Sequence, residues 1–341
     1  MAAALRIPNG LTGLGNDRGM TLTVLGCGTL GIAILSGILS SLHEASSIPS
    51  PAYPDSGTAT PTTEGPPQRT PTNFIACVRR PESAKRIRLA VQEYQPRSVT
   101  VLQNENVRGV EAADVIILGC KPYMVADILL QEGMKEALAG KLLISICAGV
   151  PVEQMGRVLY GDNYPADNPA NACTLVRVMP NTAALVRESM TVIATNNPPL
   201  PAELSALVAW IFTRIGRVVH LPPAMMDVST ALCGSGPAFL ALMLESLADG
   251  AVAMGLPRAE AQLMAAQTMR GTAGLVQHGE HPALVREKVS TPGGCTIGGL
   301  LVLEEGRVRG TVARSVREAT VVAAQLGKGI SGVNGTRFER Q

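Results

Sequence analysis

Residues 21–31 read TLTVLGCGTLG: an apolar run, a turn with three glycines, and the start of a second apolar stretch. The glycines have the G-x-G-x-x-G spacing of a strand-to-helix turn that binds a dinucleotide. The first glycine forms the turn, the second admits the pyrophosphate and the third lets helix and strand pack closely. We therefore expect cofactor contacts from Gly26, Cys27, Gly28, Thr29, Leu30 and Gly31. The alternative is a glycine-rich turn of the core.

Short apolar runs continue along the first two-thirds of the chain and alternate with helical patterns. They predict strands at 21–25, 73–78, 99–102, 115–118, 142–146, 175–179, 190–194 and 217–221, with helices between them such as 81–95 and 124–139. Apolar runs without alternation are typical of strands buried on both faces. The predicted fold class is α/β, with an N-terminal Rossmann doubly wound sheet in residues 20–222 followed by an all-α C-terminal domain.

The chain from about Met225 onward has helical patterns throughout. Between residues 228 and 254 the only charged side chains are Glu245 and Asp249. A helix that is apolar on nearly all sides must be surrounded by protein, and a domain this small cannot bury it alone. We therefore predict an all-helical domain at 223–330 that forms a homodimer, with a tail at 331–341.

Two segments contain little that could form a core. Residues 43–72 hold seven prolines with many Ser and Thr residues, and they predict a flexible surface insertion. Residues 1–19 contain Arg6, Arg18 and Asp17 without a secretory apolar core. We interpret them as a disordered leader, with an organellar address as the alternative.

Composition excludes several classes of partner. The net charge of +2, without basic runs among aromatic residues, argues against nucleic acid. Seven dispersed cysteines without a C-x-x-C pair predict reduced thiols in a cytoplasmic protein, and four histidines without H-x-x-x-H spacing predict no metal site. Glycines interrupt the apolar stretch 22–42 and Pro237 interrupts 228–244, so we expect no membrane span.

The second predicted strand ends in Arg79-Arg80-Pro81 rather than in an acidic residue. A carboxylate at this place binds the ribose 2′-hydroxyl of NADH, whereas arginine suits the 2′-phosphate of NADPH. Arg79 and Arg80 therefore favour NADPH, with NADH as the other donor. The alternative is two solvated arginines on a loop.

Two later strands end in residues that can reach a ligand at the same edge of the sheet. Cys120-Lys121-Pro122 follows the fourth strand and Asn181 follows the sixth. We predict that these residues contact the cofactor or substrate, since ligands bind at the carboxyl ends of parallel strands. Turn chemistry is the alternative for each.

A second glycine-rich loop, VSTPGGCTI at residues 289–297, leads into a helical pattern. Glycines let a ligand approach the backbone, and the first turn of a helix offers unpaired N–H groups and partial positive charge. The loop therefore predicts a site for a small anion, with contacts from Ser290, Thr291, Gly293, Gly294, Cys295 and Thr296.

The chain from about residue 21 to 328, apart from the insertion, resembles the pyrroline-5-carboxylate reductase family. The resemblance rests on motifs in order: TALCGSGPAF at 230–239, ADGAV at 248–252, MGLPR at 254–258, AAQT at 265–268, GEHP at 279–282, the loop at 290–297 and LEEG at 303–306. Cys233 stands where the family commonly has serine.

This resemblance implies reduction of L-1-pyrroline-5-carboxylate to L-proline by NAD(P)H, the last step of proline biosynthesis. It implies that helices of two subunits interlock, that dimers often assemble into larger rings, and that the active site lies between one subunit's Rossmann domain and the helical domains. It also implies that Thr296 hydrogen-bonds the imine nitrogen. Ser235 is the second catalytic candidate, with a helix-start hydroxyl as its alternative.

Two other functions remain open from the sequence. One is another NADPH-dependent imine or β-hydroxyacid oxidoreductase; a β-hydroxyacid enzyme needs a lysine proton donor, and no lysine of the helical part, Lys288 included, has such a setting. The other is a non-catalytic NADPH-binding protein. The hydroxyls at 290, 291 and 296 argue against it, because binding alone does not need them.

Overall fold

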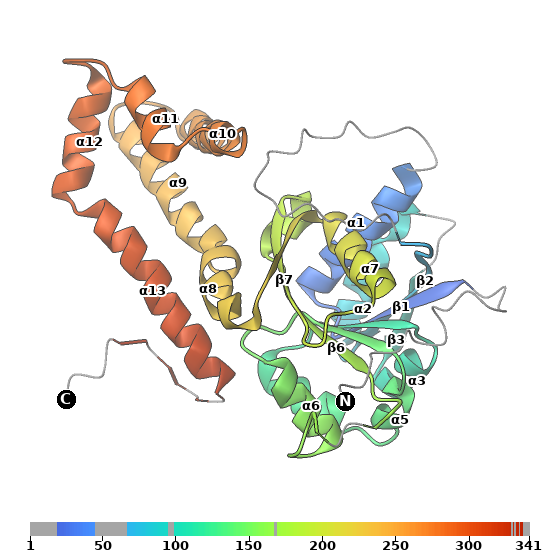
Figure 1. Ribbon diagram of the computed structural model, residues 1–341. Coiled ribbons are helices and arrows are strands. Elements are labelled where there is room, and N and C mark those ends of the chain that lie inside the picture. Colours follow the sequence, from blue (N-terminus) through green and yellow to red (C-terminus); the bar gives the residue numbers. More distant parts are fainter. Residues whose placement is uncertain are drawn as a thin grey trace.

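The computed structural model describes residues 19–44, 67–94, 99–166, 169–328, 330, 332–333 and 335–336 (Figure 1). Almost all of the predicted leader, most of the predicted insertion and most of the predicted tail lie outside these residues. The edges predicted for the insertion at 43–72 are wrong. Helix α1 (Thr29–Glu44) includes residues 43 and 44, and strand β2 begins at Pro71.

Eight strands form one sheet, and all eight lie where the apolar runs predicted them. They are β1 (Met20–Leu25), β2 (Pro71–Val78), β3 (Val99–Gln103), β4 (Val115–Leu118), β5 (Leu142–Ser145), β6 (Thr174–Met179), β7 (Ser189–Ala194) and β8 (Gly216–Leu221). Their order in the sheet is β3-β2-β1-β4-β5-β6-β7-β8. The first six strands of the chain are parallel, as a Rossmann sheet requires.

The sheet departs from a parallel arrangement at β7, which pairs antiparallel with β6, while β8 pairs parallel with β7. The connection between β6 and β7 spans only residues 180–188 and holds the short helix η3 (Thr182–Val186). A parallel crossover needs about a dozen residues or more, so this short connection returns the chain in the opposite direction.

Helices cover both faces of the sheet, and each face has its own large core. One core contains Ile34 and Ile38 of α1 with Leu207 and Ile211 of α7 (Ala202–Thr213). The other is formed by side chains of α4 (Val125–Leu129), α5 (Met134–Leu138) and α6 (Val152–Tyr160). Two helical layers on one sheet confirm the doubly wound class.

Two predicted helices are shorter than expected. The segment 81–95 forms α2 (Pro81–Ala90) and then a 3-10 turn, η1 (Gln92–Tyr94). The segment 124–139 is interrupted between α4 and α5 because Gly133 has φ +80°, a left-handed conformation outside the helical range. Of the other helices in this part, α3 (Asn106–Glu111) lies between β3 and β4, and the 3-10 helix η2 (Pro122–Met124) comes directly before α4.

The C-terminal region is helical, as predicted. A nearly continuous helical run comprises η4 (Pro223–Met225), α8 (Met226–Ser229), the π turn η5 (Thr230–Gly234) and α9 (Gly236–Ala253). Then follow α10 (Arg258–Gln277), α11 (Pro282–Val289), α12 (Cys295–Glu305) and α13 (Val308–Gly327). Figure 1 shows this region beside the sheet domain, with α13 running back toward α6. At its end, Gly327 packs against Gly149, where a Cβ on Gly327 would lie 2.7 Å from the Gly149 oxygen.

The helical region leaves much of its apolar surface exposed. Leu242 of α9 is 65% exposed, Leu263 of α10 is 71% exposed and Val302 of α12 is 65% exposed. The run Pro223–Ala253 is long and apolar enough to cross a membrane, and only 17% of its most apolar window is buried. Large exposed apolar patches mark interaction surfaces, so this region is a candidate for one.

Candidate functional site

The turn after β1 has a conformation that depends on its glycines. Gly26 has φ +70°, and a Cβ there would lie 2.8 Å from the N and Cα atoms of Cys120. The N–H groups of Gly26 and Cys27 both donate to the carbonyl of Cys77, at 3.1 Å each. Only glycine permits this turn and this close approach of two backbones.

The other two glycines differ in the space around them. A Cβ on Gly31 would lie 3.0 Å from Cγ1 of Val24 and 3.1 Å from Sγ of Cys27, so Gly31 lets α1 pack directly on β1. A Cβ on Gly28 would have the carbonyl oxygen of Gly26 as its nearest neighbour, at 3.9 Å. The space in front of Gly28 is therefore open, as a phosphate beside the N-terminus of α1 requires.

The strand register brings the other predicted cofactor residues to the same edge of the sheet. Leu25 pairs with Cys77 of β2 and with Leu118 of β4, so the segments that follow these three strands lie side by side. Arg79 and Arg80 are exposed at the end of β2, and Arg80 is the N-cap residue of α2. After β4 come the half-buried Cys120 and the exposed Lys121 and Pro122. Thr29 is exposed and Leu30 half-buried in the first turn of α1.

Cys147 belongs to this edge, although the sequence reasoning did not identify it. It lies two residues beyond β5, and its Sγ is 3.9 Å from Sγ of Cys120. Cys120 likewise lies two residues beyond β4, and the register pairs Leu118 with Ser145. Because the pairing depends on the register of β4 with β5, no local signal in the sequence marked the two cysteines as a pair.

Both polar atoms of the Asn181 side-chain amide form hydrogen bonds within the protein. Its side-chain oxygen accepts from the N–H of Ala183 at the start of η3, and its Nδ2 donates to the carbonyl of Cys233 at 3.0 Å. Asn181 therefore caps a turn and ties the sheet domain to η5. This matches the turn-chemistry alternative, and its contact with a cofactor stays a prediction.

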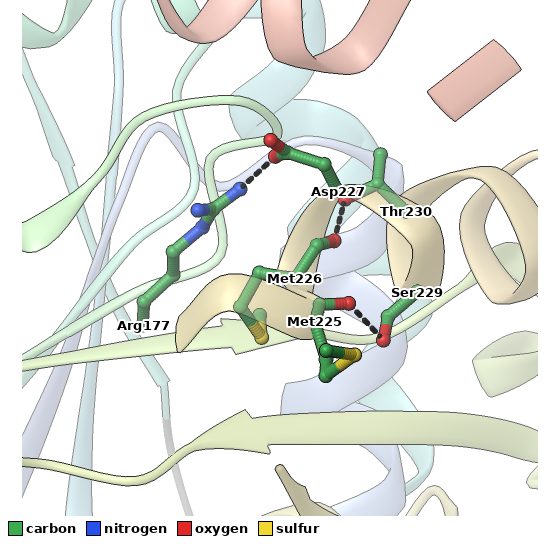
Figure 2. Close-up of polar contacts among 6 residues, drawn as sticks. All are labelled: Arg177, Met225, Met226, Asp227, Ser229 and Thr230. Atoms are coloured by element: carbon green, nitrogen blue, oxygen red, sulfur yellow. Dashed lines mark hydrogen bonds and ion pairs between the residues drawn. The ribbon is translucent and has the colours of Figure 1, made fainter. Parts of the chain in front are cut away.

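A second link between the two parts of the chain lies beside it, and sequence reasoning missed it. Arg177 of β6 forms an ion pair of 3.4 Å with Asp227 of α8 (Figure 2). Burial lowers the pKa of Arg177, and the Asp227 carboxylate opposes that shift. Figure 2 also shows Ser229 and Thr230 donating to carbonyls of the preceding turn of the helix. The start of the helical region is thus anchored on the sheet.

The loop before α12 forms an open cradle. Gly293 has φ +69°, Gly294 is the N-cap residue of α12, and its N–H donates to the carbonyl of Thr291 at 3.0 Å. Thr291, Gly293 and Cys295 are exposed, while Ser290 donates its hydroxyl to the carbonyl of Arg286. The helix start following this loop leaves N–H groups available to an anion.

Thr296 lies in the first turn of α12 and is half-buried. Its hydroxyl donates to the carbonyl of Val289 at 3.2 Å. This bond directs the hydroxyl proton into the protein and leaves the lone pairs of the oxygen for another donor. The other catalytic candidate, Ser235, is the N-cap residue of α9 and makes no side-chain hydrogen bond to that helix.

One chain does not bring the two predicted half-sites together. The dinucleotide turn joins β1 to α1 in the sheet domain, whereas α12 lies on the far side of the helical region (Figure 1). A ligand on the loop at 290–296 therefore does not meet a dinucleotide on the same chain's glycine turn. Among the described residues, no group of three or more His, Cys, Asp or Glu side chains could hold a metal ion.

Comparisons with known proteins match both parts of the chain. A family model described as pyrroline-5-carboxylate reductase dimerisation matches residues 223–326, and one described as NADP oxidoreductase, coenzyme F420-dependent, matches residues 59–149. A pyrroline-5-carboxylate reductase of Lophium arboricola is 62% identical over 319 residues, covering 94% of this chain and 97% of that protein. The Neurospora crassa protein of the same name is 56% identical, covering 93% and 96%.

Solved structures share the fold. That of Plasmodium falciparum pyrroline carboxylate reductase, with NADP bound, has a TM-score of 0.68 at 23% identity and covers 90% of this chain and 98% of its own. That of a pyrroline-5-carboxylate reductase from Coxiella burnetii has a TM-score of 0.69 at 23% identity, covering 91% and 99%. These similarities extend over both the sheet domain and the helical region.

Proposed function

Because the chain belongs to the pyrroline-5-carboxylate reductase family, we propose that it reduces L-1-pyrroline-5-carboxylate to L-proline with NAD(P)H, the last step of proline biosynthesis. The observation that carries this proposal is identity of 62% along nearly the whole length of a reductase of that name. A match confined to the sheet would have supported dinucleotide binding alone. Here it includes the substrate loop and the helical region.

The glycine turn fits a dinucleotide. The open space in front of Gly28 accommodates the pyrophosphate, and the N–H groups at the start of α1 can bind it. When bound, the nicotinamide supplies a hydride to the imine carbon of the substrate. The protein orients both molecules and excludes water, and the substrate's iminium form needs no strong general acid.

The loop at 290–296 binds the substrate. Its backbone N–H groups hold the substrate carboxylate at the start of α12, without a buried arginine. The oxygen of Thr296 accepts from the iminium N–H, because its own proton is already donated to Val289. These two contacts fix the plane of the ring and the direction from which a hydride reaches the imine carbon.

We propose NADPH as the preferred donor, with NADH as a weaker one. The support is the pair Arg79 and Arg80, exposed at the carboxyl end of β2. Guanidinium groups bind a phosphate through several N–H donors, and only NADPH carries a phosphate at the 2′ position of its adenosine ribose.

Replacing both arginines tests this preference. In an Arg79→Ala, Arg80→Ala protein, we expect the KM for NADPH to rise about tenfold, a loss of about 1.4 kcal/mol, while the KM for NADH stays within twofold. The matched control is Arg88→Ala, which removes an exposed arginine from the last turn of α2. An NADPH preference unchanged in the double variant would contradict the assignment.

A second copy of the chain completes the site and covers the apolar helices. The helical region matches the dimerisation model over residues 223–326 and exposes large side chains on α9, α10 and α12. A homodimer through this region buries that surface, and larger rings can be built from such dimers. We propose that the loop at 290–296 of one chain then faces the glycine turn of another.

Subunit contact also accounts for the apolar run Pro223–Ala253 without a membrane. We propose a cytoplasmic enzyme with no nucleic-acid partner.

A charge placed in the apolar surface tests the dimer. We expect Leu242→Glu to shift the protein from dimer to monomer in sedimentation at micromolar concentration, because a carboxylate buried in an apolar interface costs several kcal/mol. Leu89→Glu is the control, since Leu89 is a 72% exposed leucine of α2 in the sheet domain. Equal sedimentation of both variants would place the interface elsewhere.

The activity itself is tested by NADPH oxidation at 340 nm with L-1-pyrroline-5-carboxylate, beside an NADH control. We expect rapid oxidation with formation of proline. Tight NADPH binding without turnover of this imine would instead favour a reductase of other cyclic imines. Binding without turnover of any imine would favour the non-catalytic alternative.

A further inference from the structure

The pair of cysteines at the carboxyl edge of the sheet takes no part in the proposed hydride transfer. Cys120 follows β4, Cys147 follows β5, and their sulfurs are 3.9 Å apart. The Cys147 thiol also lies 3.4 Å from the carbonyl oxygens of Leu118 and Cys120. Cys120 is half-buried and Cys147 is buried. Cys120 is therefore the more accessible residue of the pair.

The backbone geometry suits a disulfide. Leu118 and Ser145 are register partners on neighbouring parallel strands, and each cysteine stands two residues further along. Neighbouring strands are about 4.8 Å apart, and disulfides join residues whose Cα atoms are roughly 4.4–6.8 Å apart. The two side chains already point at each other, so a bond needs a shift of the sulfurs but no new strand pairing.

The surroundings also favour ionisation of one thiol of the pair. The hydrogen bond between the sulfurs lowers the pKa of Cys147 and raises that of Cys120, so a first thiolate forms more easily and a second with more difficulty. Burial raises the pKa of Cys27 and Cys77 to about 12, so these two neighbours stay protonated. Thiolates, not thiols, are the reactive species.

A bond between these sulfurs would distort the dinucleotide turn. The N and Cα atoms of Cys120 pack against Gly26 so tightly that a Cβ there would lie 2.8 Å away. Disulfide formation shortens the sulfur separation from 3.9 Å to about 2.05 Å. We expect part of that shift to fall on the backbone of Cys120, and with it on Gly26 and the neighbouring Lys121.

We propose that Cys120 and Cys147 are an oxidation site at which a peroxide forms a reversible disulfide that weakens dinucleotide binding. The proposal rests on the proposed function only in that a dinucleotide occupies this edge of the sheet. Bound dinucleotide covers the edge and shields Cys120, so oxidation and cofactor binding compete. The enzyme then binds NADPH more weakly when the concentration of peroxide is high and that of NADPH is low.

The chemistry balances with hydrogen peroxide as the oxidant. The pair begins as a Cys147 thiolate hydrogen-bonded to the Cys120 thiol. The Cys120 thiol passes its proton across this hydrogen bond to Cys147, and its sulfur attacks one peroxide oxygen; an S–O bond forms, the O–O bond breaks, and hydroxide leaves and takes up a proton from solvent as water. The Cys147 thiol, now protonated, then attacks the Cys120 sulfur; the S–S bond forms, the S–O bond breaks, and the second hydroxide leaves as water with the proton that Cys147 releases. Two thiols lose two electrons, and one peroxide becomes two waters.

The experiment treats the full-length protein with hydrogen peroxide, with and without saturating NADPH, and then blocks the remaining thiols. Mass spectrometry of the digested protein reports the Cys120–Cys147 linked peptide, and fluorescence titration reports the Kd for NADPH. We expect the linked peptide to form, the Kd to rise at least about tenfold, dithiothreitol to reverse both, and NADPH to slow the linkage. Neither readout requires turnover, so a failed reductase assay leaves the test intact.

Matched variants separate the pair from other cysteines. Cys147→Ala should form no linked peptide and should not regain NADPH affinity with dithiothreitol alone after overoxidation of Cys120. Cys173→Ala removes a buried cysteine at the opposite end of β6 from the ligand edge and should behave as wild type. The absence of a linked peptide in wild type would overturn the proposal, and so would a linked protein that binds NADPH normally.

Discussion

The Gly28→Ala protein should fold as the wild type does and bind NADPH about 100-fold more weakly, a loss of about 2.8 kcal/mol. The reason is the open space in front of Gly28, where an added Cβ meets no atom closer than 3.9 Å in the protein itself. The methyl group instead occupies the place of the pyrophosphate. Thermal unfolding without ligand and a fluorescence titration with NADPH measure the two effects separately.

The neighbouring glycines are the controls for this prediction. Gly26→Ala places a Cβ 2.8 Å from the Cys120 backbone and in a left-handed conformation, so it should lower the unfolding temperature as well as the affinity. Gly31→Ala meets Val24 and the Cys27 sulfur at about 3 Å and should also destabilise the protein. If Gly28→Ala bound NADPH normally, the pyrophosphate would not lie at this turn.

Removing the Thr296 hydroxyl should have a comparably large effect on turnover. In Thr296→Ala and Thr296→Val we expect kcat/KM for L-1-pyrroline-5-carboxylate to fall about 100-fold, because the iminium N–H loses its acceptor and the ring loses its fixed orientation. The Kd for NADPH should stay unchanged, since Thr296 is proposed to contact the substrate and not the dinucleotide. Steady-state kinetics with both variants, together with the NADPH titration, measure this.

Two further variants make the Thr296 result specific. Thr296→Ser keeps the hydroxyl and its bond to Val289, and should retain activity within about fivefold. Thr272→Ala removes a hydroxyl that donates to the carbonyl of Thr268 within α10, and should leave kcat/KM within about twofold. Near-normal turnover by Thr296→Ala would show that the ring is oriented by other groups.

The sheet could be predicted from the sequence because its strands are short apolar runs, of which β1, β4, β5 and β6 are buried on both faces. Their hydrophobic pattern is a local property, and so is the glycine spacing after β1. The strand, glycine turn and helix start could therefore be located from residues 21–31 alone. The break between α4 and α5 was missed because a single glycine, Gly133, overrides a helical pattern on either side of it.

The missed parts of the site depend on contacts between distant segments. The ion pair of Arg177 with Asp227 joins residues 50 positions apart, and the Cys120–Cys147 contact joins residues 27 apart. Neither pair shows a motif, because only the sheet register brings the partners together. The separation of the substrate loop from the glycine turn is a property of the folded chain, and no spacing in the sequence encodes it.

That separation also has a genetic consequence. If each complete site takes its glycine turn from one chain and its substrate loop from another, a chain carrying Gly28→Ala and a chain carrying Thr296→Ala are defective in different halves. Within a mixed dimer, one site then combines both defects while the other combines the two intact halves. Two alleles that each abolish proline synthesis alone would restore growth without proline when expressed together in one cell.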